Sequence, residues 1–241
     1  MMTNNVLTFS TLQDLSTSLA EELNTLIYTL RKDKINMAIS GGSTPQVLFK
    51  ILADKYVSEI NWSLIHFYWV DERCVPPGHP ESNYGAAKRI LLDSLPIPPE
   101  NINRIRGEEE PGSEAARYSE VVLRNLDNVN GFPSFNITLL GIGDDGHTAS
   151  IFPDQMHLIN SSEIYVTSVH PTTSQSRITM TGTVMNNSQN TYVLVNGKSK
   201  AGMMKEILNK EPGATVYPAG YIKPVNKKLY WYLDYDAAKL L

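Results

Sequence analysis

Strand-like segments alternate with helical segments along most of this 241-residue chain, and this order predicts an α/β protein built on a largely parallel sheet. The strand-like segments are short and rich in branched and aromatic residues. The segments between them place apolar residues every three or four positions, as amphipathic helices do. Because parallel sheets are covered on both faces, we expect a three-layer α/β/α fold.

Seven segments have the length and composition of strands. In chain order they are INMAIS (35–40), LIHFYWVDE (64–72), FNITLLGIG (135–143), IYVTSVH (164–170), RITMTG (177–182), TYVLVNG (191–197) and the first part of KLYWYLDYDAAKLL (228–241). The helices between them favour parallel neighbours, because a parallel connection needs a crossover.

Regularly spaced leucines and isoleucines after Thr11 predict a first helix of about five turns. Thr44 is expected to cap a second helix with Pro45 at its first position, and Ser82 to cap a third. The predicted helices after the first are 45–52, 82–91, 114–126 and 200–208, followed by a short helical end after the last strand.

Length and composition fit a single domain covering residues 1–241, with 41% hydrophobic and 19% charged residues. The lone cysteine, Cys74, excludes an internal disulfide and a multi-cysteine metal cluster. The sequence has neither a long apolar run nor the pattern of a secretory signal, so we expect a cytoplasmic protein without a membrane partner. The net charge is −4 without a basic block, which argues against nucleic-acid binding.

Four unusual stretches each follow a predicted strand: SGGSTP, DERCVPPGHPESN, GIGDDGHTAS and NGKSK. Ligands of parallel α/β sheets bind beyond the carboxyl ends of the strands. We therefore expect these four stretches to meet in one site.

The SGGSTP stretch opens a helix, so its backbone N–H groups are expected at the positive end of the helix dipole, where a phosphate binds well. The residues concerned are Gly41, Gly42, Ser43 and Thr44. A glycine turn of this kind is more often only a turn, and both interpretations stay open.

The charged residues near strand ends also allow two interpretations. The acids of DER (71–73) could form a surface ion pair or line a site, and the sequence favours neither. Lys200 is expected in the first turn of a helix, close to where an anion would sit, and Arg177 begins RITMTG. Either side chain could instead be an ordinary solvated cation.

His147 differs from the other four histidines because glycines and Asp145 surround it at a strand end. A histidine in such a loop can take a proton from water near neutral pH. Asp145 could orient it or act as a base, or both could be turn residues. The five histidines lack the spacing of a metal site, so no metal is expected.

Taken in order, the four stretches together with RITMT resemble the 6-phosphogluconolactonases of the glucosamine-6-phosphate isomerase/6-phosphogluconolactonase family, over nearly the whole chain. DER-x-VP and GDDGHTASIFP are the specific parts of this resemblance. It implies the fold that glucosamine-6-phosphate deaminase and ribose-5-phosphate isomerase share. It also implies hydrolysis of 6-phospho-D-glucono-1,5-lactone in the oxidative pentose phosphate pathway, without cofactor or metal, by an expected monomer.

The resemblance assigns roles to particular residues. It implies catalytic roles for His147, Asp145 and Arg73. It implies substrate and phosphate binding by Gly41, Gly42, Ser43, Thr44, Arg177 and Lys200. Asp144 falls at a variable position of the family motif and receives no role.

Two alternatives remain. Glucosamine-6-phosphate deaminases share a GGSTP-like loop and a DGH element, but theirs is followed by N-E-P, and their second motif is D-E-Y. This chain has TASIFP and DER instead. A sugar-phosphate-binding regulator is more remote, because residues 1–34 offer one helix and no basic surface for reading DNA.

Overall fold

The computed structural model describes residues 5–226 and 228–241. Its centre is a six-stranded sheet in which every pair of neighbouring strands is parallel. In spatial order the strands are β1 (Asn5–Phe9), β11 (Leu229–Asp234), β10 (Thr191–Val195), β7 (Ile137–Gly141), β2 (Ile35–Ile39) and β3 (Ile65–Trp69). Most of the strands predicted from the sequence are therefore present and parallel, as expected.

Two antiparallel units accompany this sheet. The first contains β4 (Asp71–Arg73), β9 (Ser176–Met180) and β8 (Tyr165–Val169). The second pairs β5 (Asp127–Val129) with β6 (Phe132–Ser134). The segments 164–170 and 177–182 are thus strands, but they do not join the parallel sheet.

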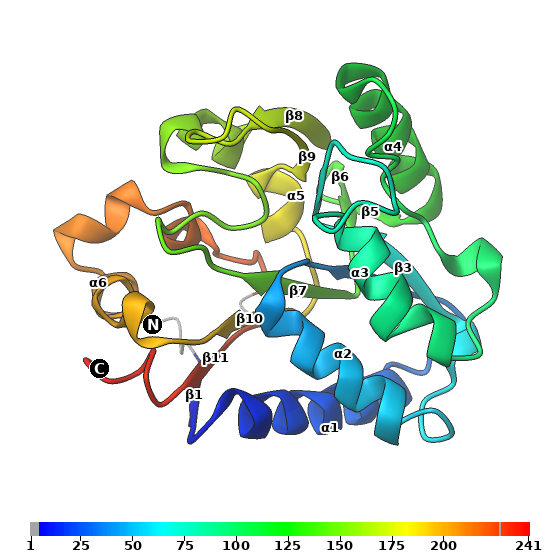
Figure 1. The fold of residues 1–241 in the computed structure, drawn as a ribbon, viewed down its shortest axis with the longest axis horizontal. Helices are drawn as coiled ribbons and strands as arrows, with labels where there is room; N and C mark the ends of the chain where they lie inside the picture. Colours follow the sequence, from blue (N-terminus) through cyan, green and yellow to red (C-terminus); the bar gives the residue numbers. More distant parts are fainter. Residues whose placement is uncertain (1–4, 227) are drawn as a thin grey trace.

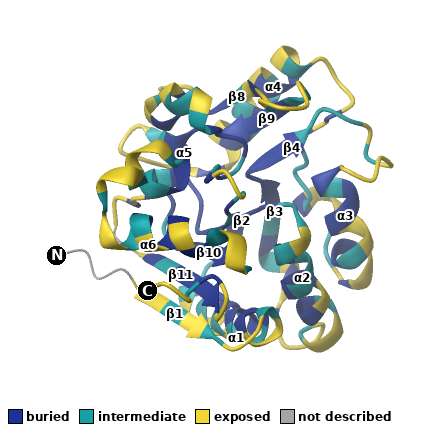
Figure 2. Ribbon diagram, turned by 60° about the vertical axis from the view of Figure 1, so that its left-hand side comes forward, coloured by how far each residue is buried: buried dark blue, intermediate teal, exposed yellow. Residues whose placement is uncertain are grey.

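The helices are α1 (Leu12–Leu30), α2 (Ser43–Lys55), α3 (Asn83–Ile90), α4 (Pro111–Asn125), α5 (Gly182–Asn186) and α6 (Ala201–Asn209). Figure 1 shows α1 and α2 on one side of the central sheet and α4 with β8 and β9 on the other. The central strands are buried between these layers, whereas the outer faces of the helices are exposed (Figure 2). The three-layer arrangement is therefore confirmed.

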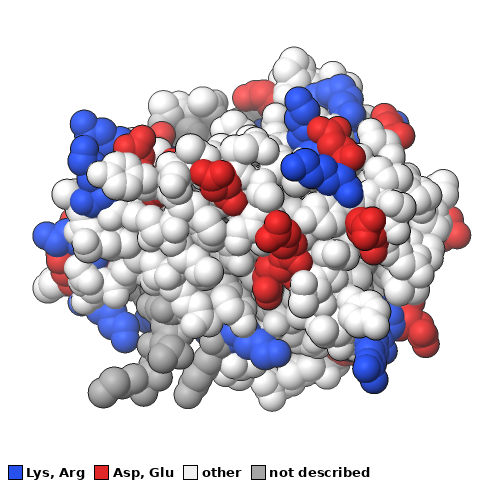
Figure 3. Space-filling view, turned by 90° about the horizontal axis from the view of Figure 1, so that it is seen from below, with Lys and Arg blue, Asp and Glu red and all other residues white. Residues whose placement is uncertain are grey.

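The charged side chains on the α1 side of the molecule do not gather by sign. Figure 3 shows lysines and arginines on this face interspersed with acidic and uncharged residues. None of the described helices is long and apolar enough to cross a membrane. Residues 1–4, on which the expected lack of a secretory signal partly depends, lie outside the described residues.

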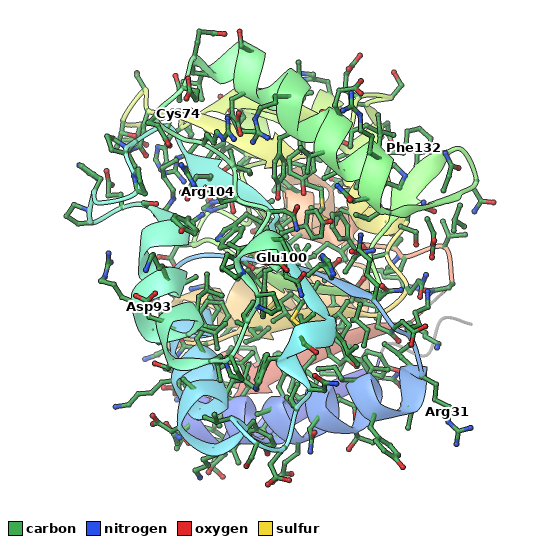
Figure 4. All side chains as sticks on the ribbon, turned by 90° about the vertical axis from the view of Figure 1, so that its right-hand side faces the viewer. Arg31, Cys74, Asp93, Glu100, Arg104 and Phe132 are labelled. Carbon is green, nitrogen blue, oxygen red and sulfur yellow. The ribbon has the colours of Figure 1, made fainter. Side chains whose placement is uncertain are left out.

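The predicted strand 64–72 is divided at Val70, and this corrects the sequence interpretation. The Val70 N–H donates to the Ile39 carbonyl at 3.0 Å, as part of the central sheet. Its carbonyl instead accepts from the Met180 N–H at 2.8 Å, so the chain passes here into the small sheet. Cys74, next after β4, lies beside that small sheet (Figure 4). An unbroken apolar run hides this change because Val70 is buried on both sides.

Two other local predictions were wrong, and one strand was not predicted. Gly42, not Thr44, caps α2, so the helix begins two residues earlier than predicted, and the φ of 96° at the cap favours glycine. The end of the chain after Asp234 forms turns rather than a helix. Strand β1 was not predicted, and its pairing partner β11 lies at the other end of the chain. Ser82 caps α3 as predicted, accepting from the Gly85 N–H at 3.0 Å.

Thr11→Ala should lower the free energy of unfolding by about 1 kcal/mol, the usual loss at a helix N-cap. The Thr11 hydroxyl accepts from the Asp14 N–H at 3.1 Å, and alanine removes this bond. Urea denaturation measures the change. Thr25→Ala, at an exposed position within α1, is the matched control. Its hydroxyl bonds only to the carbonyl of Glu21, so the control should be nearly neutral. Equal losses in both variants would contradict a capping role.

Candidate active site

A cavity of about 210 Å³ lies at the carboxyl edge of the parallel sheet. Its walls come from the loops after β2, β3, β7 and β10, so the four unusual stretches meet as expected. Of the predicted site residues it collects Gly41, Gly42, Ser43, Thr44, Arg73, His147, Arg177 and Lys200. Asp145 does not line the cavity but contacts His147.

His147 is held by the carboxylate of Asp145. Its ring Nδ1 lies 2.5 Å from Asp145 Oδ1, and its backbone N–H donates to the same oxygen at 3.1 Å. The ring also packs against Phe152, with ring centroids 4.8 Å apart. With Nδ1 engaged by a carboxylate, Nε2 is the nitrogen left for a ligand.

The glycines around His147 are required by close contacts. A Cβ on Gly143 would lie 2.1 Å from Cε1 of the His147 ring, and one on Gly146 would lie 2.4 Å from the Tyr217 ring. Gly146 also has a φ of 84°, which favours glycine. The loop therefore closes tightly around the imidazole because these two positions carry no side chain.

Partial burial raises the pKa of Asp145, but the hydrogen bonds and positive charge of His147 lower it by more. The pKa of this carboxyl is thus below its usual value. Asp145 stays ionised well into the acidic range and remains an acceptor for the imidazole.

Two arginines face each other beside the cavity. Arg73 of β4 and Arg177 of β9 are directly opposite in the antiparallel register. Arg73 donates to the Glu81 carbonyl at 2.5 Å, while Arg177 is 8% exposed. Burial lowers the pKa of Arg177, and the charge of Arg73 lowers it further. Like charges opposite each other destabilise a sheet, so an anion between them would be stabilising.

The N-terminus of α2 forms another wall. Ser43 and Thr44 begin the helix, where backbone N–H groups have no partner within the helix. A Cβ on Gly41 would lie 1.8 Å from Oδ1 of Asn83, so the loop also packs closely against α3. Thr44 Oγ1 lies 3.4 Å from Asn196 Oδ1, which joins this loop to the one after β10.

Lys200 ends a 3₁₀ turn (Lys198–Lys200) that continues directly into α6, so it stands at the start of the helix as predicted, and it lines the cavity. Its Nζ donates to Asp144 Oδ1 at 3.0 Å, and the Ser199 hydroxyl donates to the same oxygen at 2.8 Å. Asp144, for which no role was predicted, is thus the ion-pair partner of a lysine that lines the cavity.

The acids of DER do not form a surface ion pair. Glu72 is 1% exposed, and its carboxylate accepts from the backbone N–H groups of Arg73, Asn83 and Tyr84 at 2.7–2.8 Å. It thereby holds the N-terminus of α3 against β4. Asp71 lines the cavity and accepts from the Ser150 hydroxyl at 2.6 Å.

Asn83 also lines the cavity, and the sequence analysis missed it. Its side-chain amide donates to the Asp71 carbonyl at 2.9 Å. It ends the stretch DERCVPPGHPESN, which was expected at the site, but no individual role was predicted for it. Within residues 5–226 and 228–241, no group of three histidine, cysteine or acidic side chains could hold a metal ion.

The fold and the cavity define an α/β protein with a cation-lined cavity at the carboxyl edge of its parallel sheet. Residues 10–231 match the family described as glucosamine-6-phosphate isomerases/6-phosphogluconolactonase. The chain belongs to this family, as its motifs indicated.

Individual relatives support the same conclusion. The chain is 41% identical to the 6-phosphogluconolactonase of Haemophilus influenzae, with 98% of this chain and 100% of that protein covered. A crystal structure titled devB protein has a TM-score of 0.91 at 39% identity, with 98% of both chains covered. A monomeric glucosamine-6-phosphate deaminase has a TM-score of 0.81 at 21% identity, covering 98% of this chain and 100% of that one, and shares the fold.

Glu72 should make the stability of the protein depend on pH. Burial raises its pKa to about 7 from an ordinary 4.5, although the N–H groups of Tyr84, Asn83 and Arg73 oppose this. The folded protein therefore binds this proton more tightly than the unfolded chain. The contribution of Glu72 to stability is largest below the unfolded pKa and is lost as pH rises through the folded value.

Glu72→Gln removes this titration while keeping the size of the side chain. The unfolding free energy of the variant, relative to the wild type, should rise by about 3 kcal/mol between pH 4 and pH 8. The lost carboxylate acceptors add an offset that does not vary with pH. Chemical denaturation at several pH values separates the two effects, and a difference that stays constant with pH would exclude the titration.

Proposed function

We propose that this chain hydrolyses 6-phospho-D-glucono-1,5-lactone to 6-phosphogluconate, in the oxidative pentose phosphate pathway. The observation that supports this best is the His147–Asp145 pair, 2.5 Å apart, beside a cavity lined by cations. The full-length relatives named 6-phosphogluconolactonase support the same reaction. The enzyme is a hydrolase acting on a sugar lactone.

His147 is the proposed general base. Asp145 accepts from Nδ1–H, which fixes the tautomer whose Nε2 can take a proton from water. The activated water attacks the lactone carbonyl and forms a tetrahedral oxyanion. His147 then returns the proton to the ring oxygen as the ester bond breaks. A lactone is already prone to hydrolysis, so a modest catalyst suffices.

Arg73 is proposed to stabilise the developing oxyanion, because a preorganised donor is most effective where charge appears in the transition state. Its backbone N–H is bound by Glu72 and its Nη1 by the Glu81 carbonyl, so its position is set before substrate arrives. Arg73 therefore needs little reorganisation during the reaction.

The phosphate is proposed to bind the glycine loop Gly41–Thr44 at the start of α2, together with Arg177 and Lys200. These groups approach the cavity from three different elements and supply positive charge or N–H donors. Binding the distal phosphate holds the lactone carbonyl against His147. No cofactor or metal enters this mechanism.

The segment after His147 argues against the deaminase alternative. The Thr148 hydroxyl donates to the Gly141 carbonyl at 3.0 Å, and the Ser150 hydroxyl to Asp71 at 2.6 Å. These positions hold the loop in place and supply no carboxylate to the cavity. We further propose that the chain acts as a monomer, because residues of a single chain line the cavity, and that it acts in the cytoplasm.

Freshly generated 6-phosphogluconolactone and glucosamine 6-phosphate test the function directly. We expect acid release from the lactone above an enzyme-free blank, and no ammonia release from the amino sugar. Ammonia release without lactone hydrolysis would reverse the assignment in favour of a deaminase.

His147→Asn should fold normally, because the side chain lies in a cavity-facing loop. Turnover of the lactone should fall by roughly 10²–10⁴, the usual contribution of a positioned general base. Binding of 6-phosphogluconate should change little. The wild-type rate should fall on acidification, since a protonated imidazole cannot accept a proton, and the variant should lose this dependence. A variant that keeps near-wild-type turnover above the blank would assign the proton to another group.

Lys200→Met should weaken binding of the phosphorylated lactone by roughly 1.5–3 kcal/mol, the scale of a hydrogen bond to a charged group. Hydrolysis of unphosphorylated gluconolactone should change much less. Lys198→Met is the matched control, because Lys198 is exposed and does not line the cavity. Steady-state kinetics on both lactones measure the effect. Equal losses on the two substrates would remove Lys200 from the phosphate site.

A further inference from the structure

Lys200 already has an anionic partner. Its ammonium group lies 3.0 Å from a carboxylate oxygen of Asp144, and the Ser199 hydroxyl holds that oxygen at 2.8 Å. The side chain of Lys200 is 15% exposed, whereas that of Asp144 is 76% exposed. The carboxylate thus sits on the solvent side of a lysine that lines the cavity.

A phosphate that binds Lys200 must approach the same ammonium group. It would come close to the carboxylate of Asp144, and two anions near one cation repel each other. The hydrogen bond from Ser199, followed by that from Lys200, lowers the pKa of Asp144 below its usual value. Asp144 is therefore ionised whenever the enzyme works near neutral pH, and the competing charge is always present.

We propose that Asp144 competes with the substrate's phosphate for Lys200 and so limits the affinity of the site for the phosphorylated lactone and its acid product. This inference rests on the proposed function, in which Lys200 binds the phosphate. The product, 6-phosphogluconate, keeps the phosphate of the substrate and gains a carboxylate, so it binds the same cations. Weaker binding of this anion favours its release.

The opposite role, in which Asp144 positions Lys200, fits the structure less well. The Lys200 chain is already largely buried beside the cavity, so packing limits where its ammonium group can go. The exposed partner of the pair is the carboxylate. Removing the negative charge should therefore free a lysine that is already in place.

Asp144→Asn is the test, because it removes the charge and keeps an oxygen for the Ser199 hydroxyl. Isothermal titration with 6-phosphogluconate should show binding about two- to fivefold tighter than in the wild type, the range for an exposed ion pair. The KM for the phosphorylated lactone should fall in parallel, and the pH profile of turnover should keep its shape. The gain in affinity should diminish toward about 1 M salt, where charges are screened.

Asp127→Asn is the matched control. Asp127 is also an exposed aspartate paired with a lysine, Lys32, at 3.3 Å. Lys32 precedes β2, at the edge of the sheet opposite the cavity. This variant changes the net charge equally and should leave affinity unchanged. A similar gain in the control would mean that overall charge, not the contact with Lys200, sets the affinity, and would overturn the inference.

Lys200→Met and the double variant distinguish the two proposals. If competition is the mechanism, Asp144→Asn should have little effect once Lys200 is replaced by methionine. The inference fails, and the proposed function stands, if Lys200→Met weakens binding but Asp144→Asn does not tighten it. It fails equally if the gain persists without the lysine. If Lys200→Met leaves 6-phosphogluconate binding unchanged, the phosphate role of Lys200 fails first.

Discussion

All six strands of the central sheet run in the same direction, and the position of the candidate site depends on this. The parallel register brings the carboxyl ends of β2, β3, β7 and β10 to one edge, although these strands are far apart in the sequence. Each loop then needs to supply only one or two groups: N–H donors from Ser43 and Thr44, an imidazole from His147, an ammonium from Lys200. Little additional structure is needed to form this cavity, because the buried sheet already fixes the distances between its walls.

The small antiparallel sheet adds a pair of arginines beside the edge of the parallel sheet. By leaving the central sheet at Val70, the chain turns β4 alongside β9 and sets Arg73 opposite Arg177. Two guanidinium groups in such a place oppose folding, and the lowered pKa of Arg177 reflects both its burial and its neighbour. The buried carboxylate of Glu72 holds the start of α3 against this strand. The interactions of Glu72 thus stabilise an arrangement whose own charges repel.

The sequence predicted what depends on local pattern and missed what depends on distant partners. Helix α1, the cap Ser82 and the meeting of four strand-end loops follow from periodicity, capping and the geometry of parallel sheets. Strand β1 was missed because NVLTF is mostly exposed and is defined by its pairing with β11. The division at Val70 was missed because both sheets bury the same apolar run. The roles of the predicted site residues remain predictions, whereas their convergence is a feature of the structure.

Two adjacent aspartates in one loop contact different partners, and no sequence pattern predicts which partner each of them contacts. Asp145 accepts from the imidazole two residues along, since the turn at Gly146 folds the chain back on itself. Asp144 faces outward to Ser199 and Lys200, more than fifty residues away. One carboxylate therefore supports the proposed base, while its neighbour offsets part of the positive charge of Lys200. In the proposed mechanism the second effect matters for release of an anionic product, because cations left unopposed would bind the product as firmly as they bind the lactone.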